Sequence, residues 1–264
     1  MIPKEWEELL SVEHVAVRFG GLTAIADMTF KVRKGELVSL IGPNGAGKTT
    51  AFNVVSGYLA PAAGSVAFAG RSTRGLKTHE IAALGLVRTF QRTSLFTGAS
   101  ALESVMRALH KQGSSSTWAV LLGLPSVRRE EKWLRDKARE ILAFVGLADR
   151  LDHKSTSLPY GEQRLLGVAM ALATEPTLLL LDEPVSGMNP TETLSFMRIL
   201  DRIRQRGITV LLVEHDMRMV MEVSDRVLVL YQGHIIANDV PSVIQRNPEV
   251  IRAYLGDGRH RAGH

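Results

Sequence analysis

One stretch of the chain has the residue types and spacing of a loop that binds phosphate. Residues 42–49 read Gly-Pro-Asn-Gly-Ala-Gly-Lys-Thr, which fits G-x-x-x-x-G-K-[ST] between an apolar run and a helical pattern. Glycines let backbone N–H groups surround an anion, and the helix N-terminus adds its positive dipole end. Lys48 can then reach the β- and γ-phosphates of a nucleotide, and the Thr49 hydroxyl can bind Mg²⁺. The alternative is an ordinary glycine-rich turn, which the flanking strand and helix disfavour.

A second stretch places two carboxylates at the end of an apolar run. Four leucines, residues 178–181, precede Asp182 and Glu183. In open α/β sheets ligands bind beyond the carboxyl ends of the strands, so Asp182 can hold Mg²⁺ directly or through water. Glu183 can orient or deprotonate an attacking water molecule. The alternative is that both carboxylates only cap the turn before Pro184, and the phosphate loop in the same chain favours the chemical interpretation.

A sheet must bring these two stretches together. Runs of strand length occur at residues 12–17, 37–41, 86–90, 177–181, 208–213 and 226–231. Helical patterns separate them at residues 48–56, 162–173, 191–205 and 217–223. Four of the strand runs are continuously apolar, which is typical of parallel strands covered by helices on both faces. Strand alternating with helix predicts a doubly wound α/β core.

The stretch from residue 93 to 157 differs from this pattern. Helical patterns at residues 101–110 and 127–145 dominate it, with a Gly-Ser-Ser-Ser linker at 113–116. We interpret it as a helical insertion in which the charged run at 128–140 is a solvated helix face. The Gly-, Arg- and His-rich tail, residues 256–264, is expected to be frayed.

Composition narrows the class of protein. The 264 residues are 45% hydrophobic and 22% charged, which excludes disordered and collagen-like chains. Cysteine is absent, which excludes disulfides, a thiol nucleophile and a cysteine–zinc site. The net charge of +5 suits polyphosphates, nucleic acid or an anionic membrane surface. No apolar run approaches the roughly 20 residues of a membrane-spanning helix, and residues 1–10 lack a signal-peptide core. We therefore expect a soluble, cytoplasmic chain, with other subunits supplying any membrane spans.

Further motifs resemble a known family. Residues 158–164, Leu-Pro-Tyr-Gly-Glu-Gln-Arg, are similar to the signature motif of ATP-binding cassette (ABC) ATPases, and the order of all the motifs matches theirs over nearly the whole chain. The resemblance implies an α/β P-loop NTPase (RecA-like) core with an N-terminal antiparallel β subdomain and an inserted α-helical subdomain. It implies one domain over residues 1–256 (core 1–92 and 158–256, helical subdomain about 93–157) and a flexible tail at 257–264. The implied activity is hydrolysis of ATP with Mg²⁺.

The resemblance also implies a site. Expected ATP-binding residues are Phe19, Gly42, Pro43, Asn44, Gly45, Ala46, Gly47, Lys48, Thr49, Thr50, Tyr160, Gly161 and Glu162. Expected catalytic residues are Glu183, His215 (the switch histidine) and Gln91 (the Q-loop), and expected Mg²⁺ ligands are Thr49, Gln91 and Asp182. Phe19 would stack on adenine, and His215 would donate to the γ-phosphate. The plainer alternatives are a core position for Phe19, a surface amide for Gln91 and a capping or core histidine for His215. The seven other histidines are expected to be structural.

Three segments narrow the resemblance to the ATPase subunits of branched-chain amino acid importers: Tyr160, residues 184–190 and residues 247–256. Relatives that handle urea or short amides, or that export lipopolysaccharide, share parts of this pattern. The implied partners are transmembrane permease subunits, a second ABC ATPase subunit (an identical copy or a paralogue) and, indirectly, an extracytoplasmic solute-binding protein, with no nucleic acid. The implied location is the cytoplasmic face of the inner membrane.

Two other function classes were weighed. A soluble cassette protein of translation or DNA maintenance commonly fuses two cassettes or carries long coiled arms, and this chain has neither feature. A GTPase or small-molecule kinase is a third class, but no lysine here precedes an aspartate by two positions, as guanine recognition typically requires.

Two positions depart from the usual pattern of the family. Pro159 stands where most cassettes have a serine whose hydroxyl donates to the γ-phosphate held by the opposite subunit. Losing one charged hydrogen bond should cost about 1.5–3 kcal/mol of dimer closure. Asn189 stands where many cassettes have an aspartate, and its amide can still form hydrogen bonds across a dimer.

Overall fold

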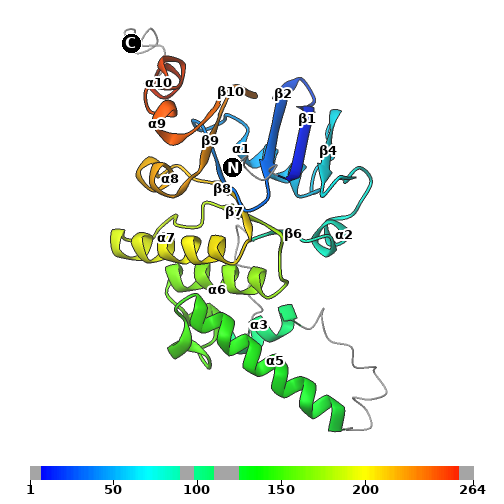
Figure 1. The fold of residues 1–264 in the computed structure, drawn as a ribbon, viewed down its shortest axis with the longest axis vertical. Helices are drawn as coiled ribbons and strands as arrows, with labels where there is room; N and C mark the ends of the chain where they lie inside the picture. The colour runs from blue at the N-terminus through cyan, green and yellow to red at the C-terminus, as the bar shows by residue number, and fades with distance from the viewer. Residues whose placement is uncertain (1–6, 90–97, 110–124, 256–264) are drawn as a thin grey trace, which may run out of the picture. The chain divides into compact units, whose positions relative to one another are not determined.

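A single mixed sheet organises most of the chain. The computed structural model describes residues 7–89, 98–109 and 125–255 (Figure 1). Within these ranges ten strands pair in the order β5-β4-β1-β2-β10-β9-β3-β8-β7-β6. The parallel half consists of β9 (Arg226–Tyr231), β3 (Leu37–Ile41), β8 (Thr209–Val213), β7 (Leu178–Asp182) and β6 (Leu86–Arg88). The antiparallel half consists of β1 (Glu8–Phe19), β2 (Leu22–Arg33), β4 (Ala63–Phe68) and β5 (Arg71–Ser72).

The central parallel strands are buried along their whole length. Every residue of β3, β7 and β8 is buried, as the continuous apolar runs predict. In the register of these strands, Leu40 of β3 and Asp182 of β7 both pair with Val213 of β8. The carboxyl ends of the three strands therefore lie level with one another, and the loops that follow them leave the same edge of the sheet.

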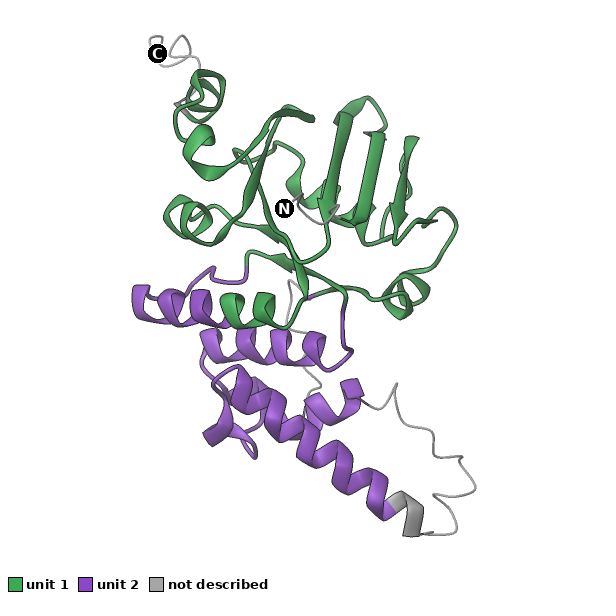
Figure 2. Ribbon diagram, viewed as in Figure 1, with its two compact units in different colours: residues 1–88, 177–183, 200–264 green, residues 89–176, 184–199 purple. Residues whose placement is uncertain are grey.

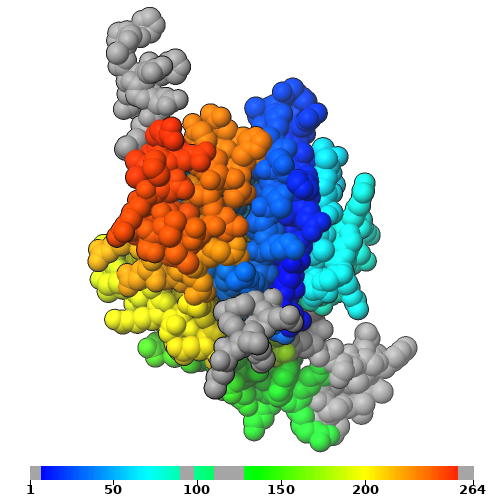
Figure 3. Space-filling model, turned by 45° about the horizontal axis from the view of Figure 1, so that its top comes forward, coloured from blue at the N-terminus to red at the C-terminus, as the bar shows by residue number. Residues whose placement is uncertain are grey.

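The antiparallel half was predicted only through the family resemblance and residues 12–17. In β2 the buried residues Met28, Phe30 and Val32 alternate with exposed polar ones, so this strand has no continuous apolar run. Strand β10 (His234–Asp239), also unpredicted, joins the two halves, antiparallel to β9 and parallel to β2. Figure 3 shows these C-terminal residues, in orange, lying beside the blue N-terminal strands.

The predicted bounds hold with two larger errors: the strand predicted at 12–17 was too short, since β1 spans Glu8–Phe19, and the strand at 86–90 was misjudged as well. Strands β3 and β9 and helix α8 (Met217–Val223) begin and end as predicted, and helix α1 (Lys48–Val55) ends one residue early. The strand predicted at 86–90 was too long, since β6 ends at Arg88 and Thr89 is not in a strand. Three helices had not been predicted from their local sequence: α2 (Thr78–Ala83), α9 (Pro241–Ile244) and α10 (Pro248–Leu255). The linker at 113–116 and the tail at 256–264 lie outside the described residues.

The chain divides into two compact units (Figure 2). The first contains the whole sheet and comprises residues 1–88, 177–183 and 200–264. The second, residues 89–176 and 184–199, contains the 3-10 turns Ala148–Arg150 and Ser155–Ser157 and the helices α3 (Ala101–Leu109), α5 (Pro125–Phe144), α6 (Tyr160–Leu172) and the first part of α7 (Pro190–Gln205). The helical subdomain expected at 93–157 falls inside it, and the division into subdomains stays a prediction.

The charged run of the second unit is a solvated helix face, as predicted. Along α5 the charged residues from Arg128 to Glu140 are exposed or half-buried, whereas Leu134, Ala138 and Leu142 are buried. This spacing of three to four residues is that of an amphipathic helix. Among the described helices, none combines the length and the apolar character needed to cross a bilayer.

One buried ion pair fastens several strands of the sheet together. Arg226, the first residue of β9, donates from Nε and Nη2 to Glu36 at 2.7 and 2.9 Å. The same guanidinium donates to Asn238 Oδ1 at 2.7 Å and to the Lys31 carbonyl at 2.6 Å. Since Glu36 directly precedes β3, this pair holds together the starts of β3 and β9, the end of β2 and a residue of β10.

Replacing Arg226 with glutamine should lower the free energy of unfolding by about 3–5 kcal/mol, because Glu36 is then buried without its counter-charge. Urea unfolding followed by circular dichroism measures this loss. Adding Glu36→Gln removes the unpaired buried charge and should recover part of the lost free energy of unfolding. A single variant within about 0.5 kcal/mol of the unsubstituted chain would show that the pair carries no net stability.

Candidate functional site

The phosphate loop, residues 42–49, leaves the carboxyl end of β3 and enters α1. Asn44, Gly45 and Thr49 are exposed, whereas Ala46 is buried beneath them and its carbonyl accepts the Gly233 N–H at 3.2 Å. The first N–H groups of a helix have no partner within it. At the start of α1 these donors adjoin an exposed, glycine-rich loop, which is an arrangement that binds anions.

Gly47 is required by both its conformation and its surroundings. Its φ of 106° is one that L side chains rarely adopt. A Cβ atom added there would lie 2.7 Å from the Ala24 carbonyl oxygen and 2.8 Å from Ile25 Cδ1. The loop therefore packs closely against the start of β2, which fixes its path before any ligand binds.

Lys48 folds back onto its own loop. Its ammonium group donates to the carbonyl oxygens of Gly42 at 2.7 Å and Pro43 at 3.1 Å. Burial lowers the pKa of Lys48, and the negative charges of Glu183 and Asp182 oppose that shift. The lysine thus lies within electrostatic range of both carboxylates, so the structure brings together the two sequence stretches that carry chemistry.

The two carboxylates at the end of β7 have different environments. Asp182 is the last residue of the strand and only 2% exposed. Glu183 is half-buried and has a φ of 47°, which is unusual for a residue other than glycine. Its N–H donates to the Val213 carbonyl at 2.9 Å, which pins the turn to β8. Strained backbone of this kind tends to occur at functional sites.

An arginine that the sequence analysis did not single out completes this cluster. Arg88, the last residue of β6, donates from Nη2 to Asp182 Oδ2 at 2.7 Å. The other oxygen, Asp182 Oδ1, is buried and has no hydrogen-bond partner within the described ranges. An unpaired buried carboxylate oxygen is costly in water-free surroundings. It suits a cation ligand, so Asp182 fits a Mg²⁺ site.

His215 and Phe19 both lie at positions open to a ligand. His215 follows β8, between β3 and β7 in the sheet, and its side chain is 62% exposed. Phe19 ends β1 at a tight turn into β2 and is 51% exposed. Neither side chain is therefore part of the core. Gln91 lies outside the described residues.

The signature segment, residues 158–164, belongs to the second unit and opens α6. Pro159 precedes the first helical residue, Tyr160, which is exposed. The Arg164 guanidinium lies 4.9 Å from the centre of the Tyr160 ring and donates to its hydroxyl. Glu162 accepts from Arg150 Nε at 2.9 and 3.1 Å, which ties the start of α6 to the preceding turn.

Asn189 caps the next helix of the second unit. Its side-chain oxygen accepts the Glu192 N–H at 3.0 Å, and the Glu192 carboxylate accepts the Asn189 N–H at 2.8 Å. This reciprocal pair is a capping box at the start of α7. The Asn189 side chain thus has a local role that an aspartate could also fill.

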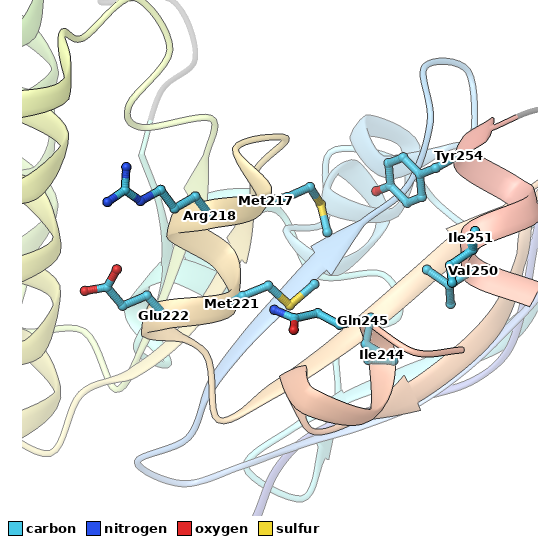
Figure 4. A pocket seen from close by; sticks show the side chains of 9 residues that line it. All are labelled: Met217, Arg218, Met221, Glu222, Ile244, Gln245, Val250, Ile251 and Tyr254. Carbon is cyan, nitrogen blue, oxygen red and sulfur yellow. The ribbon is translucent and has the colours of Figure 1, made fainter. Parts of the chain in front are cut away.

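A cavity of about 680 Å³ lies in the first unit between α8, α9 and α10 (Figure 4). Met217 and Met221 point from α8 toward Tyr254 on α10 and Gln245, whereas the phosphate loop and the carboxylates of β7 are not among its lining residues. Tyr254 keeps 40% of its surface exposed, yet burial of its hydroxyl raises its pKa to about 12, against the opposing effect of a backbone hydrogen bond from Gly42. Tyr254, on the C-terminal helix, therefore lies near the first residue of the phosphate loop.

Arg88 and Tyr254 are the residues that sequence reasoning missed. Arg88 had a usable signal, because it is a charged residue near the end of an apolar run, as Asp182 is. Predicting the strand through residue 90 concealed it, since that placed Arg88 inside the strand. Tyr254 lies within residues 247–256, which carried the family resemblance, but its proximity to Gly42 joins distant parts of the sequence and had no local signal.

Comparison with known proteins agrees with this geometry. The family model for "ABC transporter" matches residues 25–186, more than half of the chain. The model for "Branched-chain amino acid ATP-binding cassette transporter" matches residues 234–260. A solved ATP-binding cassette of an ABC transporter, in its ADP conformation, has a TM-score of 0.81 and 29% identity, covering 95% of this chain and 99% of that one.

Two curated relatives match almost end to end. The high-affinity branched-chain amino acid transport ATP-binding protein LivG of Escherichia coli is 41% identical over 252 residues, which cover 95% of this chain and 99% of LivG. The corresponding protein BraF of Pseudomonas aeruginosa is 40% identical over 250 residues, covering 94% and 98%. The chain therefore belongs to the ABC transporter family, as one of its ATP-binding cassette ATPases.

Proposed function

We propose that this ATPase powers the import of branched-chain amino acids across a membrane. The observation that carries the proposal is the match of residues 234–260 to the branched-chain amino acid family model, at the segment that contains β10, α9 and α10. The names of LivG and BraF, which match nearly the whole chain, support the same transport class.

In the proposed site the phosphate loop holds the triphosphate of ATP. Lys48 leaves the carbonyls of Gly42 and Pro43 and turns to the β- and γ-phosphates, where its charge is better compensated. Phe19 stacks on the adenine ring. The remaining loop residues contribute backbone N–H groups, and Thr50 extends the first turn of α1.

Hydrolysis requires a water molecule in line with the γ-phosphate. We assign Glu183 to orient this water and to accept its proton as the oxygen attacks phosphorus and the bond to ADP breaks. His215, exposed at the end of β8, donates to the γ-phosphate and stabilises the charge that develops there. Gln91 is proposed to contact the same water.

The donor set fits Mg²⁺ bound together with ATP. Thr49 would supply a hydroxyl, Asp182 its unpaired Oδ1 and Gln91 an amide oxygen, and phosphate oxygens of the nucleotide would serve as further ligands. When bound, Mg²⁺ neutralises charge on the β- and γ-phosphate oxygens. In nucleotide sites Mg²⁺ prefers oxygen ligands, such as those of a carboxylate and a hydroxyl.

The chain has one phosphate loop and one signature segment, so two cassettes must combine to complete a site. We propose a dimer with an identical copy or a paralogue in which Tyr160, Gly161 and Glu162 face the ATP held by the partner. Because Glu162 forms a salt bridge with Arg150, we assign Glu162 the role of fixing the start of α6. Transmembrane permease subunits at the cytoplasmic face of the membrane, and a solute-binding protein acting through them, complete the assembly.

The transporter that copurifies with this chain should import leucine in an ATP-dependent manner when reconstituted into liposomes. Uptake of labelled leucine is measured with urea and acetamide as comparison substrates, because related systems handle small amides. ATP-driven uptake of urea or acetamide in the absence of leucine uptake would contradict the proposed substrate class.

Substituting Glu183 with glutamine should lower ATP turnover at least about a hundred-fold, because an amide cannot accept the proton of the water. ATP binding should persist, since the phosphate loop is unchanged. Glu175→Gln is the matched control: Glu175 also has a positive φ, of 52°, but its side chain is 63% exposed and paired with Lys137. Turnover of Glu183→Gln close to that of this control would refute the role of Glu183.

Restoring a hydroxyl with Pro159→Ser should tighten the ATP-dependent dimer of the Glu183→Gln chain about ten-fold or more, if each serine gains one charged hydrogen bond. Pro159 has a φ of −52° and a ψ of 152°, which serine adopts readily as a helix N-cap. Pro159→Ala removes the ring and adds no hydroxyl, so it separates the two effects. Analytical ultracentrifugation measures the affinities, and equal values for Ser and Ala would mean that backbone N–H groups carry the contact alone.

A further inference from the structure

Asp182 is held by a residue that has no role in the proposed function. Arg88 Nη2 donates to Asp182 Oδ2 at 2.7 Å, and the two side chains are only 12% and 1% exposed. A buried carboxylate needs a counter-charge, and a guanidinium supplies one that never deprotonates. Arg88 is thus the fixed positive neighbour of the proposed metal ligand.

The guanidinium is also anchored to the helix that follows the phosphate loop. Arg88 Nη1 donates to Asn53 Oδ1 at 2.7 Å and lies 3.4 Å from Ser56 Oγ, and both residues are on or next to α1. The rings of Phe52 and Tyr58 lie 5.7 and 5.8 Å from its central carbon, within cation–π distance. Contacts on several sides leave the guanidinium little freedom, so its position is set before nucleotide arrives.

The two carboxylate oxygens of Asp182 have different surroundings. Oδ2 is occupied by Arg88, whereas Oδ1 is buried with no partner in the part of the chain that the structure describes. If Arg88 donated to both oxygens, the carboxylate would have no oxygen free to bind a cation. If Arg88 donated to neither, the Asp182 side chain could rotate away from the edge of the sheet. Partners of metal ligands commonly fix ligand orientation in this way.

We propose that Arg88 is the positioning residue of Asp182: it holds Oδ2 so that Oδ1 stays presented to the Mg²⁺ of Mg–ATP. This inference rests on the proposed role of Asp182 as a ligand of that ion. Arg88 itself touches neither the ion nor the phosphates, and it acts through the carboxylate alone.

Manganese(II) is the probe, because its paramagnetism reports metal binding without turnover. Binding of Mn²⁺ to the full chain saturated with ADP is followed by electron paramagnetic resonance. Arg88→Gln should raise the Mn²⁺ dissociation constant about ten- to a hundred-fold, the usual effect of losing a partner of a metal ligand. Affinity for ADP in excess EDTA should stay within about two-fold, since the phosphate loop is untouched. Arg88→Lys keeps the charge but not the fork to Asn53, and should weaken Mn²⁺ less.

The control is Arg226→Gln, which removes another guanidinium that pairs with a buried carboxylate and an asparagine oxygen, at Glu36 and Asn238, although Arg226 donates to both oxygens of its carboxylate. It should leave the Mn²⁺ affinity unchanged despite its cost in stability. Asp182→Asn tests the underlying function separately: if it binds Mn²⁺ as tightly as the unsubstituted chain, the metal role of Asp182 is wrong. If Asp182→Asn weakens Mn²⁺ and Arg88→Gln does not, or if Arg88→Gln weakens metal-free ADP binding equally, the positioning role of Arg88 is wrong.

Discussion

The rest of the site depends on the register of β3, β8 and β7, which places the carboxyl ends of the three strands level with one another. Because Leu40 and Asp182 both pair with Val213, the phosphate loop, His215 and the two carboxylates leave one edge of the sheet together. A shift of one residue in the ladder between β7 and β8 would turn Asp182 to the opposite face. The burial of these apolar strands holds them together, so the hydrophobic core supports the geometry of the site.

The polar groups at that edge are arranged before a nucleotide binds. Gly47 is wedged against β2, Glu183 is held in a strained conformation by its hydrogen bond to Val213, and Arg88 fixes one oxygen of Asp182. Under the proposed function, Lys48 would change partners, from two carbonyls to the phosphates. A site that is ordered in advance loses little conformational entropy when the nucleotide binds. Its charged groups already point toward the atoms on which charge develops during the reaction.

Local sequence patterns predicted the parts of this site that lie within one strand and its following loop. The phosphate loop and the pair Asp182–Glu183 are of this kind, and so are the bounds of β3 and β9. Arg88 stands near the end of an apolar run, but its pairing with Asp182 joins residues 94 positions apart, and nothing local to either residue predicts that pairing. Strand β2 alternates apolar and polar residues, which is a strand signal that was overlooked, whereas β10 has a weaker signal because none of its residues is buried. These features depend on which strands become neighbours, and that is decided by the whole sheet.

A crystal structure of the Glu183→Gln chain with ATP and Mg²⁺ tests the central claim most directly. The account predicts that the triphosphate lies along residues 42–49 with Lys48 on its β- and γ-phosphates. It predicts the metal on the Oδ1 side of Asp182, directly or through one water, while Arg88 stays on Oδ2. A triphosphate bound elsewhere, or a metal with no direct or water-mediated link to Asp182, would contradict it.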